Sequence, residues 1–245
     1  MTVQQFLEQF YVKFDEVSTL ASSPYTPAEL SLIATEAQEL LVTSYYDNLS
    51  NLKKEGFEET EKRIQDLGEL VKDAQLSPEV PSVDNMPNGR FFLLPNTLIA
   101  NPTDYSDVFW FTVFEEAITN MKDTCTTSPT YNTFKRVAIK EINHNEFTAL
   151  MRDPFNRPNK DRVFRMRIAG RRQELITDGT YQVTKYHVRY IKKPQPIVLT
   201  GTSTNRVSEL SDQVHRELLN KTLELALSNT GNWNRFIIES QKNIG

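Results

Sequence analysis

One cluster in the sequence combines residue types that perform hydrolysis. Ser211, Asp212 and His215 bring a hydroxyl, a carboxylate and an imidazole to the start of an expected helix. An adjacent imidazole activates a serine in many hydrolases. No nucleophile elbow or oxyanion motif accompanies this trio. We therefore favour a structural interpretation, in which Ser211 caps the helix, Asp212 stabilises the first turn of that helix, and His215 lies at the surface. A hydrolase remains a remote alternative.

Residue counts argue against metal and nucleotide chemistry. The chain has three histidines and one cysteine, Cys125, which is too few for a structural zinc site and excludes an internal disulfide. Eight glycines in 245 residues form neither a dinucleotide-binding fingerprint nor a phosphate-binding loop. The carboxylates show no spacing that singles out a catalytic pair. We expect no catalytic residue, no cofactor and no metal site.

Charge is distributed unevenly along the chain. The whole sequence holds 28 Lys and Arg against 32 Asp and Glu, a net charge of −4. Residues 1–89 have 6 basic and 16 acidic side chains, whereas residues 135–193 have 15 and 6. Such a chain can attract copies of itself head to tail, or turn a basic face toward a polyanion.

The basic stretch supplies the candidate functional residues. Its cations alternate with aromatic residues, a combination that suits phosphate contact or a protein interface. A solvated sheet face paired with local acids explains it equally well, and direct nucleic-acid binding is disfavoured by a sequence pI of about 5.6. The candidate subunit-interface or DNA-facing residues are Arg162, Arg165, Arg167, Arg171, Arg172, Lys185, Arg189, Lys192 and Lys193.

Both ends of the chain have helical patterns. Apolar residues at helical spacing predict helices over about 3–20, 27–56 and 58–75. Thr2 with Gln5, and Thr26 with Glu29, have the spacing of capping boxes. A fourth helix follows Ser211, and Trp233, Phe236 and Ile237 suggest a last helical segment. These helices need partners for their apolar faces, so we expect them to pack together.

The middle of the chain is expected to be mainly antiparallel β-structure. Strands are predicted at 91–94, 108–119, 136–142 and 162–168, with a short helix at 145–152. The stretch 108–119 has the pattern of a strand buried on both faces. Asp178-Gly179 predicts a hairpin, and Ile197-Val198-Leu199 an edge strand.

These elements predict an α+β fold in which a helical bundle from both termini carries an inserted antiparallel β-rich domain. The predicted boundaries are an N-terminal helical region at 1–76, a proline-rich linker at 77–89, the β-rich domain at 90–200 and a C-terminal helical region at 201–245. No stretch approaches the roughly 18 consecutive apolar residues of a membrane span, and the first twenty residues do not resemble a signal peptide, so a soluble protein without membrane contact is expected.

Three strings of residues resemble a known family. They are the segment Asn145 to Lys160 with the strand Arg162 to Ile168, the segment Tyr190 to Leu199, and the segment Glu209 to Leu219 leading into Thr222 to Leu227. Their order is similar to that of structural proteins of crAss-like bacteriophages, specifically the ring-forming head-to-tail connectors, or portal adaptors. The resemblance covers about residues 90–230.

This resemblance implies a non-enzymatic virion component. Such a protein forms a closed ring, twelve-fold in the family, beneath the portal protein and beside other tail ring proteins. The ring joins the capsid to the tail and surrounds the genomic DNA without sequence-specific contact. It is assembled in the host cytoplasm and located at the portal vertex. No catalytic residue is carried over.

The charge pattern suits a ring, because identical subunits in a ring contact each other through two unlike patches. We expect the acidic helices to face the channel or a neighbour's basic patch, and Arg165, Arg167, Arg171 and Arg172 to make subunit or ring contacts. A nucleic-acid-binding module that uses the basic β-hairpin is the alternative.

Overall fold

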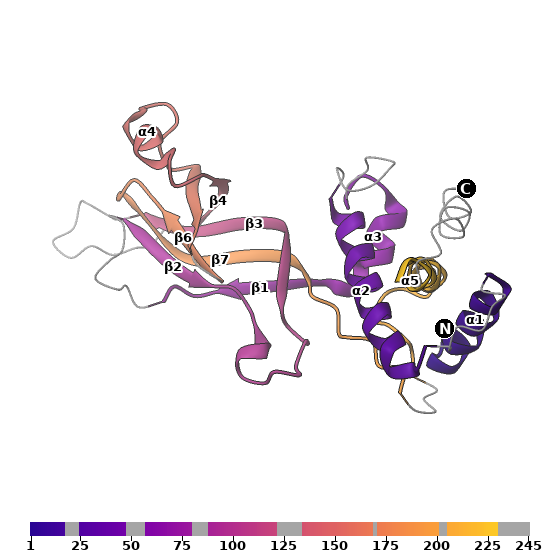
Figure 1. Cartoon of the computed structure of the whole chain (residues 1–245). Coiled ribbons are helices and arrows are strands. Elements are labelled where there is room, and N and C mark those ends of the chain that lie inside the picture. The colour runs from indigo at the N-terminus through magenta and orange to yellow at the C-terminus, as the bar shows by residue number, and fades with distance from the viewer. Residues whose placement is uncertain are drawn as a thin grey trace. The chain divides into compact units, whose positions relative to one another are not determined.

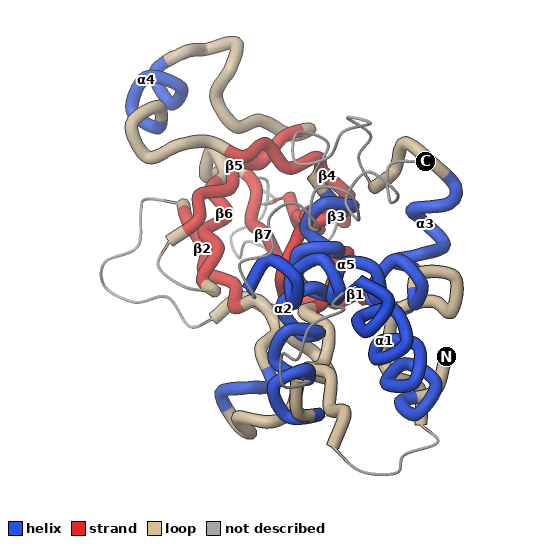
Figure 2. Tube along the Cα trace, turned by 45° about the vertical axis from the view of Figure 1, so that its right-hand side comes forward, coloured by secondary structure: helices blue, strands red, loops and turns tan. Residues whose placement is uncertain are grey.

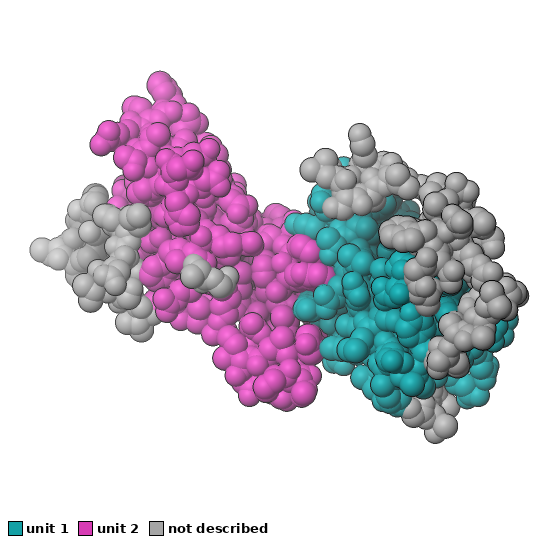
Figure 3. All heavy atoms as spheres, viewed as in Figure 1, with its two compact units in different colours: residues 1–71, 193–245 teal, residues 72–192 magenta. Residues whose placement is uncertain are grey.

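The computed structural model describes residues 1–17, 25–47, 57–79, 88–121, 134–168, 171–200 and 205–229. The chain forms two compact units (Figure 3). The helical unit contains residues 1–71 and 193–245, and the sheet unit contains residues 72–192. Within the described residues the fold is mixed α+β, with five α-helices and one seven-stranded sheet.

Three helices from the two ends of the chain share the core of the helical unit. They are α1 (Val3–Val17), α2 (Pro27–Tyr46) and α5 (His215–Asn229), which lie side by side (Figures 1 and 2). Their buried side chains include Phe6, Phe10, Leu30, Ala34, Leu218, Leu223 and Ala226. The packing of the terminal helices into one hydrophobic core agrees with the helical patterns at both ends.

Both predicted capping boxes are confirmed. Thr26 accepts from the Glu29 N–H at 3.3 Å, and the Glu29 carboxylate accepts from the Thr26 N–H at 2.8 Å. Thr2 and Gln5 make the same reciprocal pair, at 3.1 and 3.3 Å. These bonds satisfy N–H groups that a helix leaves unpaired at its start.

The predicted helix over 58–75 is wrong in its second half. The helix α3 spans only Glu61–Leu67, a 3-10 turn follows at Gly68–Leu70, and the strand β1 spans Val71–Leu76. Leu67 and Leu70 are fully buried. The spacing of these leucines fits a helix, but residues 71–76 join the sheet beside β7 (Tyr181–Lys192), and this tertiary pairing overrides the local pattern.

The predicted edge strand at 197–199 is also wrong. The Ile197 and Leu199 N–H groups donate to the side-chain oxygens of Thr35 and Ser31 on α2, at 3.0 and 2.9 Å. Both apolar side chains enter the helical core. The alternation of buried and exposed residues is that of a strand, but the hydrogen-bond partner is a helix.

The sheet has the order β1-β7-β3-β4-β5-β6-β2 and is curled. Its further strands are β2 (Gly89–Leu93), β3 (Phe109–Met121), β4 (Phe134–Glu141), β5 (Arg162–Arg167), β6 (Arg172–Ile176) and β7 (Tyr181–Lys192). Side chains from six strands form its core, among them Phe92, Ala117, Val137, Val163, Leu175 and Tyr186. The strands predicted at 91–94, 108–119, 136–142 and 162–168 are therefore present, with shifted ends.

Asp178-Gly179 makes a turn but not the predicted hairpin. Gly179 has φ +89°, a conformation that glycine adopts without strain. The flanking strands β6 and β7 do not pair with each other, because β6 lies between β5 and β2 while β7 lies between β1 and β3. The turn instead passes the chain from one side of the curled sheet to the other.

One further sheet prediction needs correction, and a second has one exception. The strand β3 is not buried on both faces, since Phe114 is 46% exposed. The prediction of a mainly antiparallel sheet is confirmed, with the exception that β4 and β5 pair in parallel. Parallel neighbours need a crossover connection.

The connection between β4 and β5 contains α4 (Phe147–Arg152) and projects from the sheet as an arm (Figures 1 and 2).

Some predictions lie outside the described residues. These are the last helical segment around Trp233 to Ile237, the end of the second helix after residue 47, and most of the proline-rich linker. Among the helices that the structure describes, none combines the length and the apolar content needed to cross a bilayer.

Candidate functional site: the basic stretch and two exposed surfaces

Arg165 is an internal charge rather than a surface contact. Its side chain is 4% exposed and forms ion pairs with Glu115 on β3 at 3.1 Å and Glu141 on β4 at 2.5 Å. Tyr186 on β7 donates to Glu115 at 2.8 Å. Burial removes Arg165 from the contact face that its position in the sequence suggested.

Arg165 and its neighbours shift one another's pKa values. Burial raises the pKa of Glu115, partly opposed by Arg165, and burial also raises the pKa of Tyr186. Burial alone would lower the pKa of Arg165, but Glu115 and the other acceptors keep that pKa above its ordinary value. The network therefore ties four strands together as a structural element.

The other candidates on β5 and β6 lie in different settings. Arg162 is half-buried and donates to backbone carbonyls in the arm, while Arg167 is exposed at the end of β5. Arg171 precedes β6, and Arg172 pairs with Glu79 at 3.3 Å. Because the Arg172 carbonyl accepts from the Ile168 N–H, the ends of β5 and β6 meet. Arg167, Arg171 and Arg172 are thus brought to one end of the sheet.

The candidates on β7 are mostly engaged locally. Lys185 donates to Gln75 at 3.1 Å, and Arg189 lies 3.8 Å from Asp73. Lys192 is only 4% exposed, which corrects its predicted surface position. Lys193 belongs to the helical unit, where it pairs with Glu39 at 2.9 Å.

Counting by structural unit changes the charge contrast. The sheet unit holds 17 basic against 14 acidic side chains, net +3, and the helical unit 11 against 18, net −7. Acids outside the basic stretch, such as Asp73 and Glu115, lie against its cations. The two units therefore keep opposite signs, but the sheet unit is less basic than the stretch 135–193 alone.

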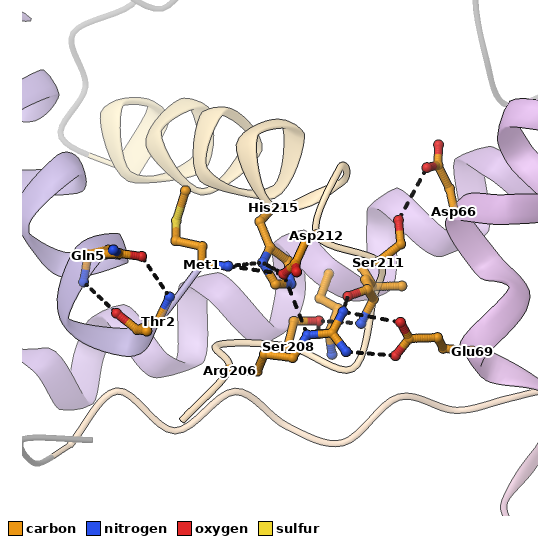
Figure 4. Close-up of polar contacts among 12 residues, drawn as sticks. Met1, Thr2, Gln5, Asp66, Glu69, Arg206, Ser208, Ser211, Asp212 and His215 are labelled. Atoms are coloured by element: carbon orange, nitrogen blue, oxygen red, sulfur yellow. Dashed lines mark hydrogen bonds and ion pairs between the residues drawn. The ribbon is translucent and has the colours of Figure 1, made fainter. Parts of the chain in front are cut away.

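Ser211, Asp212 and His215 do not form a hydrolytic triad. The Ser211 hydroxyl donates to Asp66 at 3.3 Å, whereas His215 Nδ1 lies 3.0 Å from the Met1 amino group and 3.2 Å from Asp212 (Figure 4). Among the described contacts no hydrogen bond joins Ser211 to His215. The serine and the imidazole point to different partners, so the arrangement lacks an activated nucleophile.

His215 is also buried, contrary to its predicted surface position. It is fully inaccessible, and α5 begins at this residue rather than at Ser211. Burial lowers the pKa of His215, assisted by the nearby Met1 amino group. Asp212 is held by that amino group at 3.0 Å and lies 3.5 Å from Arg206, which pairs with Glu69 at 2.9 Å. This polar cluster fixes the start of α1 to the start of α5.

Two exposed surfaces were missed by the sequence analysis. The first is in the arm, where Phe155 is 88% exposed. The second is on α2, where Leu32 is 74% and Leu40 44% exposed. Two signals in the sequence indicate these surfaces. Turn-forming residues lie on both sides of Phe155, and Leu32 lies off the apolar stripe of its helix.

Among the described residues, no group of three or more His, Cys, Asp and Glu side chains is arranged to hold a metal ion. The polar clusters instead connect secondary-structure elements within each unit.

Comparison with known proteins gives a consistent result. The chain is 27% identical over 243 residues to a protein named Ring protein 4/5 from Bacteroides phage crAss001, covering 92% of each chain. It is also 27% identical over 240 residues to Ring protein 3 of the same phage, covering 93% of this chain and 95% of that one. A family model described as phage tail ring protein 3/4 matches residues 1–234, including the front helices that the resemblance did not reach. The chain therefore belongs to the phage tail ring protein 3/4 family.

Proposed function

We propose that this structural ring protein forms a closed ring of identical copies that connects the portal and capsid to the tail. The family match over residues 1–234 is the observation that carries the proposal. The ring takes twelve copies, as the resemblance implies, and lies against the portal protein and other ring proteins. It acts without catalysis, is assembled in the host cytoplasm and becomes part of the portal vertex.

The charges of the two units support contacts between unlike patches. A closed ring of identical subunits uses heterologous contacts, in which one patch meets a different patch of the next copy. The helical unit carries net −7 and the sheet unit net +3. Opposite charges guide encounter and fix the register of such contacts more than they add affinity.

We further propose that the ring surrounds the genomic DNA with little attraction for phosphate. Neutralised phosphates give DNA binding its strength, so a channel lined by unpaired cations would hold the duplex. Several cations of the sheet unit are paired with acids, including Arg136 with Glu116 at 2.7 Å and Arg172 with Glu79. Local neutralisation of this kind lets DNA pass.

Reconstruction of the neck of the phage that encodes this chain tests the connector role. We expect density that fits the chain in a ring between the capsid vertex and the tail, with DNA along its axis. Density that places the chain in the capsid shell or in a fibre would contradict the connector role while leaving membership of the family unaffected.

A further inference from the structure

The arm between β4 and β5 holds one aromatic side chain outward. Asp153 Oδ1 accepts from the Phe155 N–H at 2.9 Å, and Asp153 Oδ2 accepts from Asn156 Nδ2 at 2.6 Å. Arg162 donates to the carbonyls of Phe155 and Arg157, at 3.0 and 3.3 Å. The turn is thus fixed from both ends while the phenyl ring of Phe155 stays 88% exposed. A single exposed apolar residue is common, but one displayed on a preorganised turn lowers the entropic cost of docking.

The surroundings of Phe155 are basic. Arg152 and Arg157 are exposed, and no acid among the described residues pairs with either guanidinium group. The arm projects from the sheet (Figures 1 and 2). Because the three side chains are exposed, they are accessible to another molecule. An aromatic residue flanked by arginines is the composition typical of the energetic centre of a protein interface. We call residues 152–157 the arm knob.

The helical unit has a surface of opposite character. Leu32, Glu36 and Leu40 follow one another every four residues along α2, so they form a continuous stripe on the helix surface. All three are exposed, and Glu36 has no hydrogen-bond or ion-pair partner among the described residues. Glu29 and Glu39 lie on the same side of the helix. We call Leu32, Glu36 and Leu40 the α2 stripe.

We propose that the arm knob of one copy docks on the α2 stripe of the next copy in the ring, an inference that rests on the proposed ring. Both surfaces have exposed apolar groups, and their unpaired charges are opposite. The ring of Phe155 covers Leu32, and Arg157 pairs with Glu36. The knob and the stripe are different patches, so each copy uses its knob toward one neighbour and its stripe toward the other. This geometry gives the heterologous contact that a ring requires.

Complementation between two variants tests the proposal. Phe155→Ser removes the knob and leaves the stripe, while Leu32→Ser removes part of the stripe and leaves the knob. Mass photometry of the full chain should show that each variant needs a concentration about tenfold higher or more to assemble. An equal mixture should give dimers with one intact contact, which neither variant forms alone. Phe134→Ser is the matched control, because Phe134 is also an exposed phenylalanine of the sheet unit, at 69%.

A charge exchange tests the register. Arg157→Glu and Glu36→Arg should each weaken assembly, and the double variant should recover most of it. Glu8→Arg, on the exposed side of α1, is the control for reversing a helical acid. Circular dichroism and the thermal midpoint should be unchanged, since these side chains are exposed.

The outcomes separate the two proposals. If the Phe155→Ser and Leu32→Ser variants form rings at the same concentration as the wild type, the docking proposal is overturned. The proposal of a ring is then unaffected. Weakened assembly without dimers in the mixture would show that the two surfaces do not meet. A wild-type chain that stays monomeric would overturn both proposals.

Discussion

At the scale of single residues, burial rather than residue type decides the role of each cation. Arg165 and Arg167 lie two positions apart on β5, yet Arg165 is buried while Arg167 is exposed. A sequence shows that both share one side of a strand, but it does not show that Glu115 and Glu141 from other strands enclose the first. Reversing Arg165 to glutamate would therefore disturb the fold and cannot by itself report on ring contacts.

Truncation of Arg165 tests its structural role. Arg165→Ala leaves Glu115 buried without its cation, and removing one partner of a buried ion pair typically costs about 3–5 kcal/mol. We expect the free energy of unfolding of the sheet unit, measured by urea denaturation, to fall by about 3 kcal/mol. Arg167→Ala should change it by less than about 0.5 kcal/mol. Equal effects of the two substitutions would contradict the internal role of Arg165.

The buried His215 predicts a pH dependence. Because burial lowers its pKa in the folded state, the unfolded chain binds more protons, and stability falls as pH drops below the unfolded pKa of about 6.5. Substitution of His215 by asparagine removes this loss, so the unfolding midpoint of the variant should fall less than that of the wild type between pH 7 and 5.5. His144→Asn, at an exposed histidine, should follow the wild type. Parallel curves for His215→Asn and wild type would contradict the assignment.

At the scale of elements, local signals located most helices and strands but not their partners. Capping boxes and apolar periodicity placed α1 and α2 because those signals act within a few residues. The pairing of β1 with β7, the crossover between β4 and β5, and the placement of residues 197–199 depend on contacts distant in the sequence. Contacts distant in the sequence also decide which of the candidate basic residues are buried, paired or exposed. The sequence therefore indicates these residues as a group but does not distinguish among them.

The contact between residues 197–199 and α2 can be tested at one hydroxyl. Thr35→Val leaves the Ile197 N–H without its acceptor, and an unsatisfied buried polar group costs about 1–3 kcal/mol. We expect a loss of about 1–2 kcal/mol in the unfolding free energy of the helical unit. Thr43→Val is a close control, because both hydroxyls also donate to the carbonyl four residues earlier in α2. A loss no greater than that of Thr43→Val would show that the hydrogen bond to Ile197 contributes little.

At the scale of the whole molecule, opposite net charges on two compact units are the property that best links sequence to assembly. The contrast between the first 89 residues and the basic stretch is visible in the sequence. Counted by unit, the contrast falls to −7 and +3, since the sheet unit also includes residues 72–134, which hold more acids than bases. In the proposed ring, the remaining contrast would favour contacts between copies over attraction to DNA.

Weak DNA binding follows from this charge balance. Fluorescence anisotropy with a labelled duplex at physiological salt should show no binding tighter than the nonspecific range of about 10⁻⁴ to 10⁻⁶ M. Nanomolar binding that weakens steeply with salt would favour a nucleic-acid-binding module instead. This measurement uses the wild-type chain, so its result does not depend on the variants of the docking test.

The oligomeric state of the purified full-length chain tests the central claim most directly. Native mass spectrometry combined with electron microscopy should find one dominant species of fixed stoichiometry, twelve copies by the resemblance, whose class averages are closed rings. A chain that remains monomeric at every concentration, or that forms only two-fold dimers through one self-complementary patch, would contradict the account.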